Sequence, residues 1–170
     1  KIFSNKVLLG IINSNLINFY HKYKFLDLEK RLFQKILIAN CKKIPIANIL
    51  ENQKNKLEEI VNNMIELNNS FDLLKNKFLT LLMSDFNIKI NRKLSENWYK
   101  IDWIQFEKII KSNKAFSGEK KEEWFDRFLR LKDEANSISN NRYTLDNELD
   151  AIVYDLYNLT KEEIEIVENS

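Results

Sequence analysis

The chain has 170 residues, among them two glycines, one proline, one cysteine and one histidine, and its formal net charge is +2. So few turn-forming residues exclude a sheet-rich fold and favour a chain that is mostly helix. One cysteine excludes an internal disulfide and fits a reducing cytoplasm. Two glycines cannot build a phosphate-binding loop, and a single histidine offers neither a catalytic triad nor a metal cluster.

The beginning of the chain resembles no signal peptide, and its longest apolar run, near Val7–Ile12, is too short to cross a bilayer. We therefore expect a cytoplasmic protein with no membrane partner. Because the sequence starts at Lys1 rather than at Met, we also expect a longer parent chain.

The first expected element is a helix from Ser4 or Asn5 to about Lys24. Its apolar face is carried by Leu8, Ile12, Leu16, Phe19 and Tyr23. The β-branched stretches 36–38 and 44–46 predict two small strands, a minor β element in a mainly α fold.

An apolar rhythm of seven residues dominates the middle of the chain. It runs through Leu50, Leu57, Met64, Phe71 and Phe78, with a companion row at Ile60, Leu67, Leu74 and Leu81. This spacing predicts one long coiled-coil-like helix over about 48–85. Asn48 with Glu51 three positions later has capping-box spacing, and Asp85 stands where the next apolar residue would fall.

A second seam follows at Trp124, Phe128, Leu131, Ala135 and Ile138, in a helix that Ser117 can cap. Folded back against the first seam, it predicts a long antiparallel helical hairpin. The part of the first seam left over is expected to pack on residues 1–46 or 145–168. Between the two seams, Asp102 and Gln105 predict the start of a short helix that ends within 112–114.

The end of the chain is clearly punctuated. Leu145, Leu149, Ile152, Val153 and Leu156 form an apolar stripe. Asn158 can take the left-handed position that closes a helix, and Thr160 with Glu163 predicts a capping box for a last helix. We divide the chain into three parts: residues 1–47; residues 48–142, a helical spacer; and residues 143–170, a docking segment.

Charge is unevenly distributed along the chain. Residues 1–56 carry 11 Lys and Arg against 3 Asp and Glu, whereas residues 143–170 carry 1 against 8. A basic stretch mixed with aromatic and amide side chains is typical of a phosphate-binding surface, although a solvated helix face gives the same pattern. The candidate DNA-binding residues are Tyr20, His21, Lys22, Lys24, Lys30, Arg31, Gln34, Lys35, Lys42 and Lys43.

Two other groups of residues allow a simple structural interpretation. Trp98, Tyr99 and Trp103 could stack on an unpaired base, but packing against the hairpin is favoured. The acidic pair Glu122 and Glu123 lies in the first turn of a helix, where interaction with the helix dipole accounts for it. No catalytic residue, metal ligand or cofactor motif is found.

Three stretches together resemble one known family. They are Leu8–Tyr20, then Phe33–Ile36 leading to Lys42–Ile46, and finally Leu145–Glu168. They resemble the closing part of TaqI-like adenine-specific DNA methyltransferases, including the type IIG enzymes that fuse methylase and restriction endonuclease. Two positions depart from the family pattern: Asn158 replaces a usual Gly, and Gln34 stands where Pro is frequent.

The resemblance implies a C-terminal DNA-specificity module that binds double-stranded DNA, with residues 1–47 as the end of its target-recognition domain. Because the hairpin satisfies its own seam, we expect a monomer. Adenine methylation, cleavage or both would be performed by upstream catalytic domains of the same chain, with S-adenosylmethionine and Mg expected there and no cofactor here. By itself this chain would not be an enzyme. The alternative is a coiled-coil scaffold that docks domains or dimerises without contacting DNA.

Overall fold

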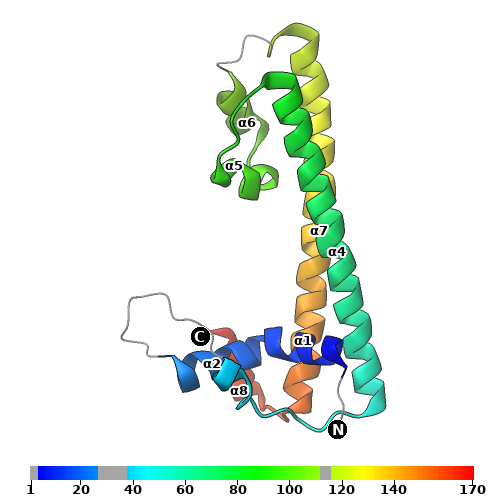
Figure 1. The fold of residues 1–170 in the computed structure, drawn as a ribbon, viewed down its shortest axis with the longest axis vertical. Coiled ribbons are helices and arrows are strands. Elements are labelled where there is room, and N and C mark those ends of the chain that lie inside the picture. Colours follow the sequence, from blue (N-terminus) through cyan, green and yellow to red (C-terminus); the bar gives the residue numbers. More distant parts are fainter. Residues whose placement is uncertain (1–3, 27–37, 112–115) are drawn as a thin grey trace. The chain divides into compact units, whose positions relative to one another are not determined.

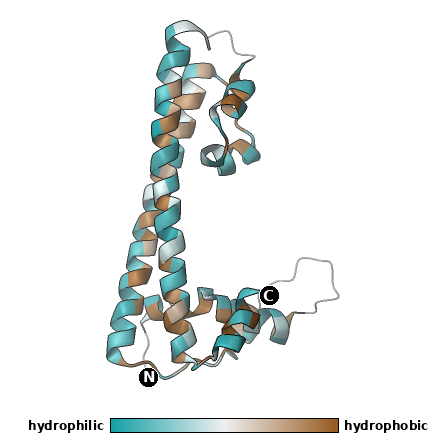
Figure 2. Ribbon diagram, turned by 180° about the vertical axis from the view of Figure 1, so that it is seen from behind, coloured by the Kyte–Doolittle hydropathy of each residue, from teal (hydrophilic) through white to brown (hydrophobic). Residues whose placement is uncertain are grey.

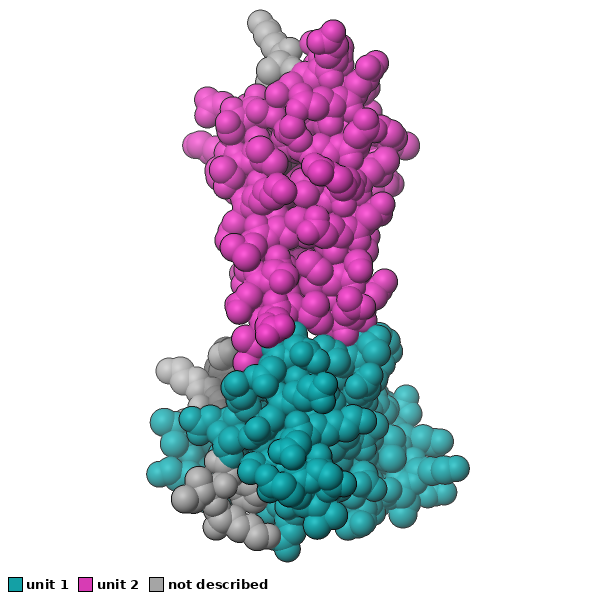
Figure 3. All heavy atoms as spheres, turned by 90° about the vertical axis from the view of Figure 1, so that its right-hand side faces the viewer, with its two compact units in different colours: residues 1–64, 143–170 teal, residues 65–142 magenta. Residues whose placement is uncertain are grey.

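A computed structural model describes residues 4–26, 38–111 and 116–170. The chain forms two compact units (Figure 3): unit 1 comprises residues 1–64 and 143–170, and unit 2 comprises residues 65–142. Each unit has its own hydrophobic core. Unit 1 is discontinuous in sequence, since unit 2 is inserted between its two parts.

The described residues are mainly helical, as predicted. The elements in chain order are α1 (Asn5–Asn13), α2 (Asn15–Phe25), α3 (Ile38–Cys41), α4 (Glu51–Phe86), α5 (Arg92–Asn97), the 3-10 helix η1 (Trp98–Lys100), α6 (Trp103–Ile110), α7 (Gly118–Leu156) and α8 (Lys161–Glu168). The long helices α4 and α7 lie side by side in each unit (Figure 1). The predicted antiparallel hairpin is confirmed.

In unit 2 the two predicted seams meet around an aromatic core. The Phe78 ring stacks on Trp98 from η1, with ring centroids 4.2 Å apart, and Phe106 from α6 stacks on Phe128 of α7 at 4.4 Å. All four side chains are fully buried. Trp98 thus packs against the hairpin, as the sequence favoured, and its ring is not available to a base.

The buried stripe of α4 drifts away from a strict heptad near its end. Leu82 and Phe86 are buried there, whereas Leu81 is only half-buried. A straight α-helix has 3.6 residues per turn, so a repeat of 3.5 slips by about 20° per heptad. The residue that faces the core therefore lies one position later in the sequence than the strict heptad predicts. Figure 2 shows apolar and polar residues sharing the surface of both long helices.

Unit 1 has a core to which the N-terminal helices and both long helices contribute. It contains Val7, Ile11, Ile17, Ile44, Leu57, Ile60, Val61, Leu149, Val153 and Leu156. The surplus part of the first seam thus packs on both segments considered from sequence. Gly10 allows the close approach of α1, since a Cβ there would lie 3.0 Å from Val61 Cγ2 and 3.2 Å from Leu149 Cδ1.

The single helix predicted up to Lys24 is wrong, because the chain breaks at Ser14. Ser14 has extended dihedral angles, ends α1 and caps α2. The predicted apolar face is also misplaced: Val7 and Ile11 are fully buried, while Ile12 is 40% exposed. The buried face of α1 consists of Val7, Gly10 and Ile11, one residue earlier than predicted. Gly10 adds no apolar side chain to the pattern, so the sequence did not reveal this face.

The small β element is not found among the described residues. Ile38 begins α3, residues 44–46 form no strand, and positions 36 and 37 lie outside the described residues. The predicted cap at Asn48 is also wrong, since α4 begins at Glu51 and the N–H of Leu50 donates to Gln53 Oε1 at 3.1 Å. Residues 45–50, which include Pro45, have no regular secondary structure, and α4 begins directly after them.

The capping motifs near the end of the chain are confirmed. Asn158 has φ 53°, and the N–H of Leu159 donates to the carbonyl of Tyr154 at 3.1 Å, which closes α7 in a Schellman motif. Capping boxes begin α6 at Asp102 and α8 at Thr160. Helix α7 runs without interruption across residue 142.

Candidate nucleic-acid interface

Six of the ten candidate DNA-binding residues are described, and all six belong to unit 1. Tyr20, His21, Lys22 and Lys24 lie on the last two turns of α2, and Lys42 and Lys43 follow α3. The remaining four, Lys30, Arg31, Gln34 and Lys35, lie outside the described residues.

The start of α2 is fixed by two side chains. Ser14 Oγ accepts from the N–H of Ile17 at 3.3 Å and donates to the carbonyl of Ile11 at 2.7 Å. The N–H of Asn15 donates to Asp150 Oδ1 of α7 at 2.7 Å. Asp150 thus accepts from an N–H in the first turn of α2 that has no partner within the helix, and this hydrogen bond ties α2 to α7.

The end of α2 carries an aromatic and cationic surface. The Lys22 ammonium lies 5.2 Å from the centre of the Tyr23 ring, and the Tyr23 ring lies 4.6 Å from that of Phe19. Tyr23 and Lys24 are exposed. His21 Nε2 is buried with no hydrogen-bond partner in the part of the chain that the structure describes. Lys22 and Lys24 also suit the negative end of the helix dipole, which is their purely structural role.

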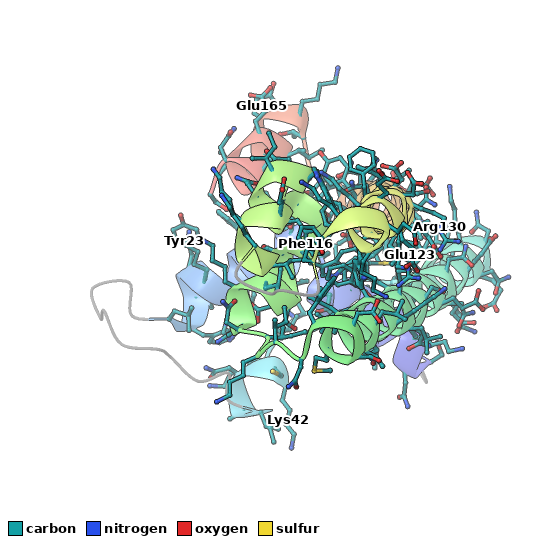
Figure 4. All side chains as sticks on the ribbon, turned by 90° about the horizontal axis from the view of Figure 1, so that it is seen from above. Tyr23, Lys42, Phe116, Glu123, Arg130 and Glu165 are labelled. Atoms are coloured by element: carbon teal, nitrogen blue, oxygen red, sulfur yellow. The ribbon has the colours of Figure 1, made fainter. Side chains whose placement is uncertain are left out.

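A tight turn presents the second cationic group. The N–H of Lys42 donates to the carbonyl of Ile38 at 3.1 Å, and the N–H of Lys43 to that of Asn40 at 2.9 Å. Both lysines are exposed. Figure 4 shows Tyr23 of α2 and Lys42 after α3 projecting outward from the ribbon.

The segment after this turn is anchored from α7. Ile44 is buried in the core of unit 1. The hydroxyl of Tyr157 donates to the carbonyl of Pro45 at 2.7 Å and accepts from the N–H of Ala47 at 3.4 Å. Burial raises the pKa of Tyr157 despite the hydrogen bond from Ala47. The hydroxyl therefore stays protonated and able to donate. Its hydrogen bonds tie the segment that follows Lys42 and Lys43 to the end of α7.

Asp150 belongs to an acidic cluster with Asp146 and Glu168. Sequence reasoning did not identify this cluster. Burial raises the pKa of Asp150 to about 6, the hydrogen bond from Asn15 opposes this, and the charges of Glu168 and Asp146 add to the rise. Tyr154, buried beside it, donates to the Glu168 carboxylate. The available signal was Asp150 itself, a charged residue inside the apolar stripe of α7.

Unit 2 holds a second polar network, centred on Asp85, where the sequence indicated only the end of the first seam. Asp85 Oδ2 accepts from Trp124 Nε1 at 2.8 Å and lies 3.0 Å from Lys120 Nζ and 3.3 Å from Arg127 Nη1. Burial works to raise the pKa of Asp85, but the hydrogen bonds from Lys120 and Trp124 and the charges of Lys120 and Arg127 outweigh it, so the pKa lies below its usual value. This carboxylate is a structural cross-link between α4 and α7.

Two kinds of feature are absent from the described residues. No group of three or more His, Cys, Asp or Glu side chains in residues 4–26, 38–111 and 116–170 could hold a metal ion. Within the same residues, no helix combines the length and apolar character needed to cross a membrane.

Comparison with known proteins identifies a family. No curated protein and no solved structure matches the chain. A family described as a domain of unknown function, DUF8810, matches residues 50–153. That range begins one residue before α4 and ends within the last turn of α7, so it contains the long helices almost entirely and all of α5, η1 and α6. The chain therefore belongs to the DUF8810 family.

Proposed function

We propose that the chain is the C-terminal DNA-sequence-specificity module of a type IIG-like restriction–modification enzyme. In this proposal unit 1 contacts double-stranded DNA, and upstream domains methylate adenine, cleave the DNA or do both. Those domains would use S-adenosylmethionine and Mg. The likeness of Leu8–Tyr20 and Leu145–Glu168 to the closing part of TaqI-like enzymes supports the assignment.

The observation that carries the proposal is the fixed presentation of cations in unit 1. Lys24, Lys42 and Lys43 are exposed, and they stand on elements held by Asp150 and Tyr157 through the hydrogen bonds described above. Lysines on a backbone held in this way can meet phosphate oxygens with less loss of backbone freedom on binding. Tyr23, next to Lys24 on α2, adds an exposed aromatic ring.

The alternative is a scaffold that docks domains without contacting DNA. Its dimeric form would use the α4 seam, but Leu57, Leu74 and Phe78 are already buried inside this chain. A dimer through the seam would have to expose these side chains first, at a cost of about 1.5–3 kcal/mol for each one. The hairpin is thus favoured as a monomeric spacer.

A salt titration with a matched control tests the proposal. Binding of a fluorescent duplex DNA to the full chain is measured by anisotropy between about 50 and 200 mM salt. We expect the logarithm of affinity to fall linearly with the logarithm of salt concentration. The variant K24Q/K42Q/K43Q should bind more weakly, with a slope smaller by about 2–3 if each lysine contacts one phosphate.

The control variant K89Q/K93Q/K108Q removes the same charge from exposed positions in unit 2. It should keep the wild-type slope. Equal loss in the two variants would mean that net charge, and not the unit 1 surface, governs binding. Binding that does not depend on salt would contradict phosphate contacts altogether.

A further inference from the structure

Unit 2 has a surface hollow that plays no part in the proposed DNA contact. It has a volume of 550 Å³ and lies where the start of α6 meets the first turns of α7. Its lining consists of Trp103, Gly118, Lys121, Glu122, Phe125 and Asp126. We call the site that these six residues line the aromatic hollow.

Two rings form the apolar walls of the aromatic hollow. Trp103 and Phe125 meet edge to face, with ring centroids 5.1 Å apart and planes at 89°. Trp103 is fixed from behind by Phe106 and Phe128, at centroid distances of 5.5 and 5.9 Å. Phe125 is 40% exposed, although its neighbour Trp124 is fully buried. A rigid aromatic surface is thus open to a ligand.

The charges around the aromatic hollow are unbalanced. The Lys121 ammonium forms an ion pair with Glu107 of α6, which neutralises the one cation in the lining. Glu122 and Asp126 are exposed and have no ion-pair partner among the residues that the structure describes. They stand four positions apart on α7, hence on the same side of the helix.

We propose that the aromatic hollow binds an arginine side chain of a partner polypeptide. A guanidinium group stacks on an aromatic face and donates in a fork to carboxylate oxygens. Trp103 and Phe125 supply the first contact, and Glu122 and Asp126 supply the second. Both kinds of contact are present at one site with the appropriate charge.

Other occupants fit less well. An apolar side chain would cover Glu122 and Asp126 without offering a donor, and an unpaired buried charge is costly. A lysine ammonium neutralises one carboxylate but is strongly hydrated and cannot stack as a plane. A phosphate or a nucleic acid backbone would be repelled by the two carboxylates.

The test uses a short peptide with the full chain in solution. The probe is acetyl-Ala-Arg-Ala-amide, and its control carries citrulline, which has nearly the same shape as arginine but no charge. Binding is followed by NMR through the indole N–H resonance of Trp103, assigned with the variant W103F. The resonances of Trp98 and Trp124, both fully buried, serve as internal references for the fold.

We expect the arginine peptide to shift the Trp103 resonance and to bind about fivefold more tightly than the citrulline peptide. The variant E122Q/D126N should reduce the affinity for the arginine peptide by a similar factor. The variant D133N/E134Q changes the charge equally at exposed positions of the same helix and should leave the affinity unaltered. Equal affinity for the two peptides, or a Trp103 resonance that never moves, would overturn the proposal.

Discussion

Asp150 is a carboxylate whose environment opposes its charge. Its pKa of about 6 in the folded chain lies above the ordinary value of 3.8, so the folded state binds the proton more tightly than the unfolded state does. The destabilisation is fully present above pH 6 and is relieved as pH falls from 6 toward 3.8. The difference sets a ceiling of about 3 kcal/mol on the effect.

We therefore expect the substitution D150N to raise the free energy of unfolding at pH 7, because an amide oxygen can still accept from the N–H of Asn15. The gain over the wild type should shrink between pH 6 and pH 4. Urea denaturation at pH 7 and pH 4.5, followed by circular dichroism, measures both effects. A variant that is less stable at both pH values would show that the charge itself holds α2.

Asp85 presents the opposite case, since its pKa lies below 3.8 in the folded chain. The stability that it contributes is present above the unfolded pKa and is lost as pH falls through the lower folded value. We expect D85A to cost about 1–3 kcal/mol at pH 7, because Trp124 Nε1 loses its acceptor in a partly buried site.

D85N is the informative companion to this variant, because it keeps an acceptor for Trp124 and removes only the charge. It should recover part of the loss. D72A, at an exposed position of α4, is the matched control and should change the free energy of unfolding by less than about 0.5 kcal/mol. If D85A behaves like D72A, the network does not cross-link the hairpin.

At the scale of the element, the long helices were predictable because their apolar seams span several heptads. Each heptad by itself predicts a helix with one apolar face. The single-residue drift of the buried stripe was not expected from a strict heptad. Leu81 belongs to the strict repeat, yet Leu82 is the residue that is fully buried.

This drift yields a paired prediction for neighbouring leucines. L82A should lower the free energy of unfolding by about 2–5 kcal/mol, as large-to-small changes in a packed core do. L81A, at a half-buried position, should cost clearly less. Both are measured by urea denaturation under the same conditions. A larger loss for L81A would mean that the strict heptad, and not the drifted stripe, faces the core.

Short elements were less predictable than long ones, for physical reasons that individual residues show. Ser14 can sit in a helix or cap one, and the next residue, Asn15, donates its N–H to Asp150, which is 135 positions further along the sequence. Ile38 has strand propensity, yet no partner strand exists among the described residues and it lies in α3. The roles of Asn158 and Thr160 could be predicted because each motif involves only residues close in sequence.

The candidate DNA-binding surface was predicted from composition, and its residues remain a prediction. The structure adds what the sequence could not: which of the six described residues are exposed and what holds them. The aromatic hollow escaped sequence reasoning because Trp103 and Phe125 come from different helices.

At the scale of the whole molecule, the two units have separate cores, and we expect each to fold on its own. One protein joins 1–64 to 143–170 through a short Gly-Ser linker, and the other consists of residues 65–142. Both should give helical circular dichroism spectra and cooperative thermal transitions. The first should lose its transition when V153D places a charge in its core. Failure of both proteins would show that the cores depend on each other.

The discontinuity of unit 1 also has a consequence during synthesis. Val7, Ile11 and Ile17 find their partners Leu149 and Val153 only after the ribosome has made everything in between. At about 5–20 residues per second, this leaves apolar side chains uncovered for on the order of 10 s. We expect such a nascent chain to bind chaperones that recognise exposed apolar segments. Truncation before residue 143 would leave that exposure permanent.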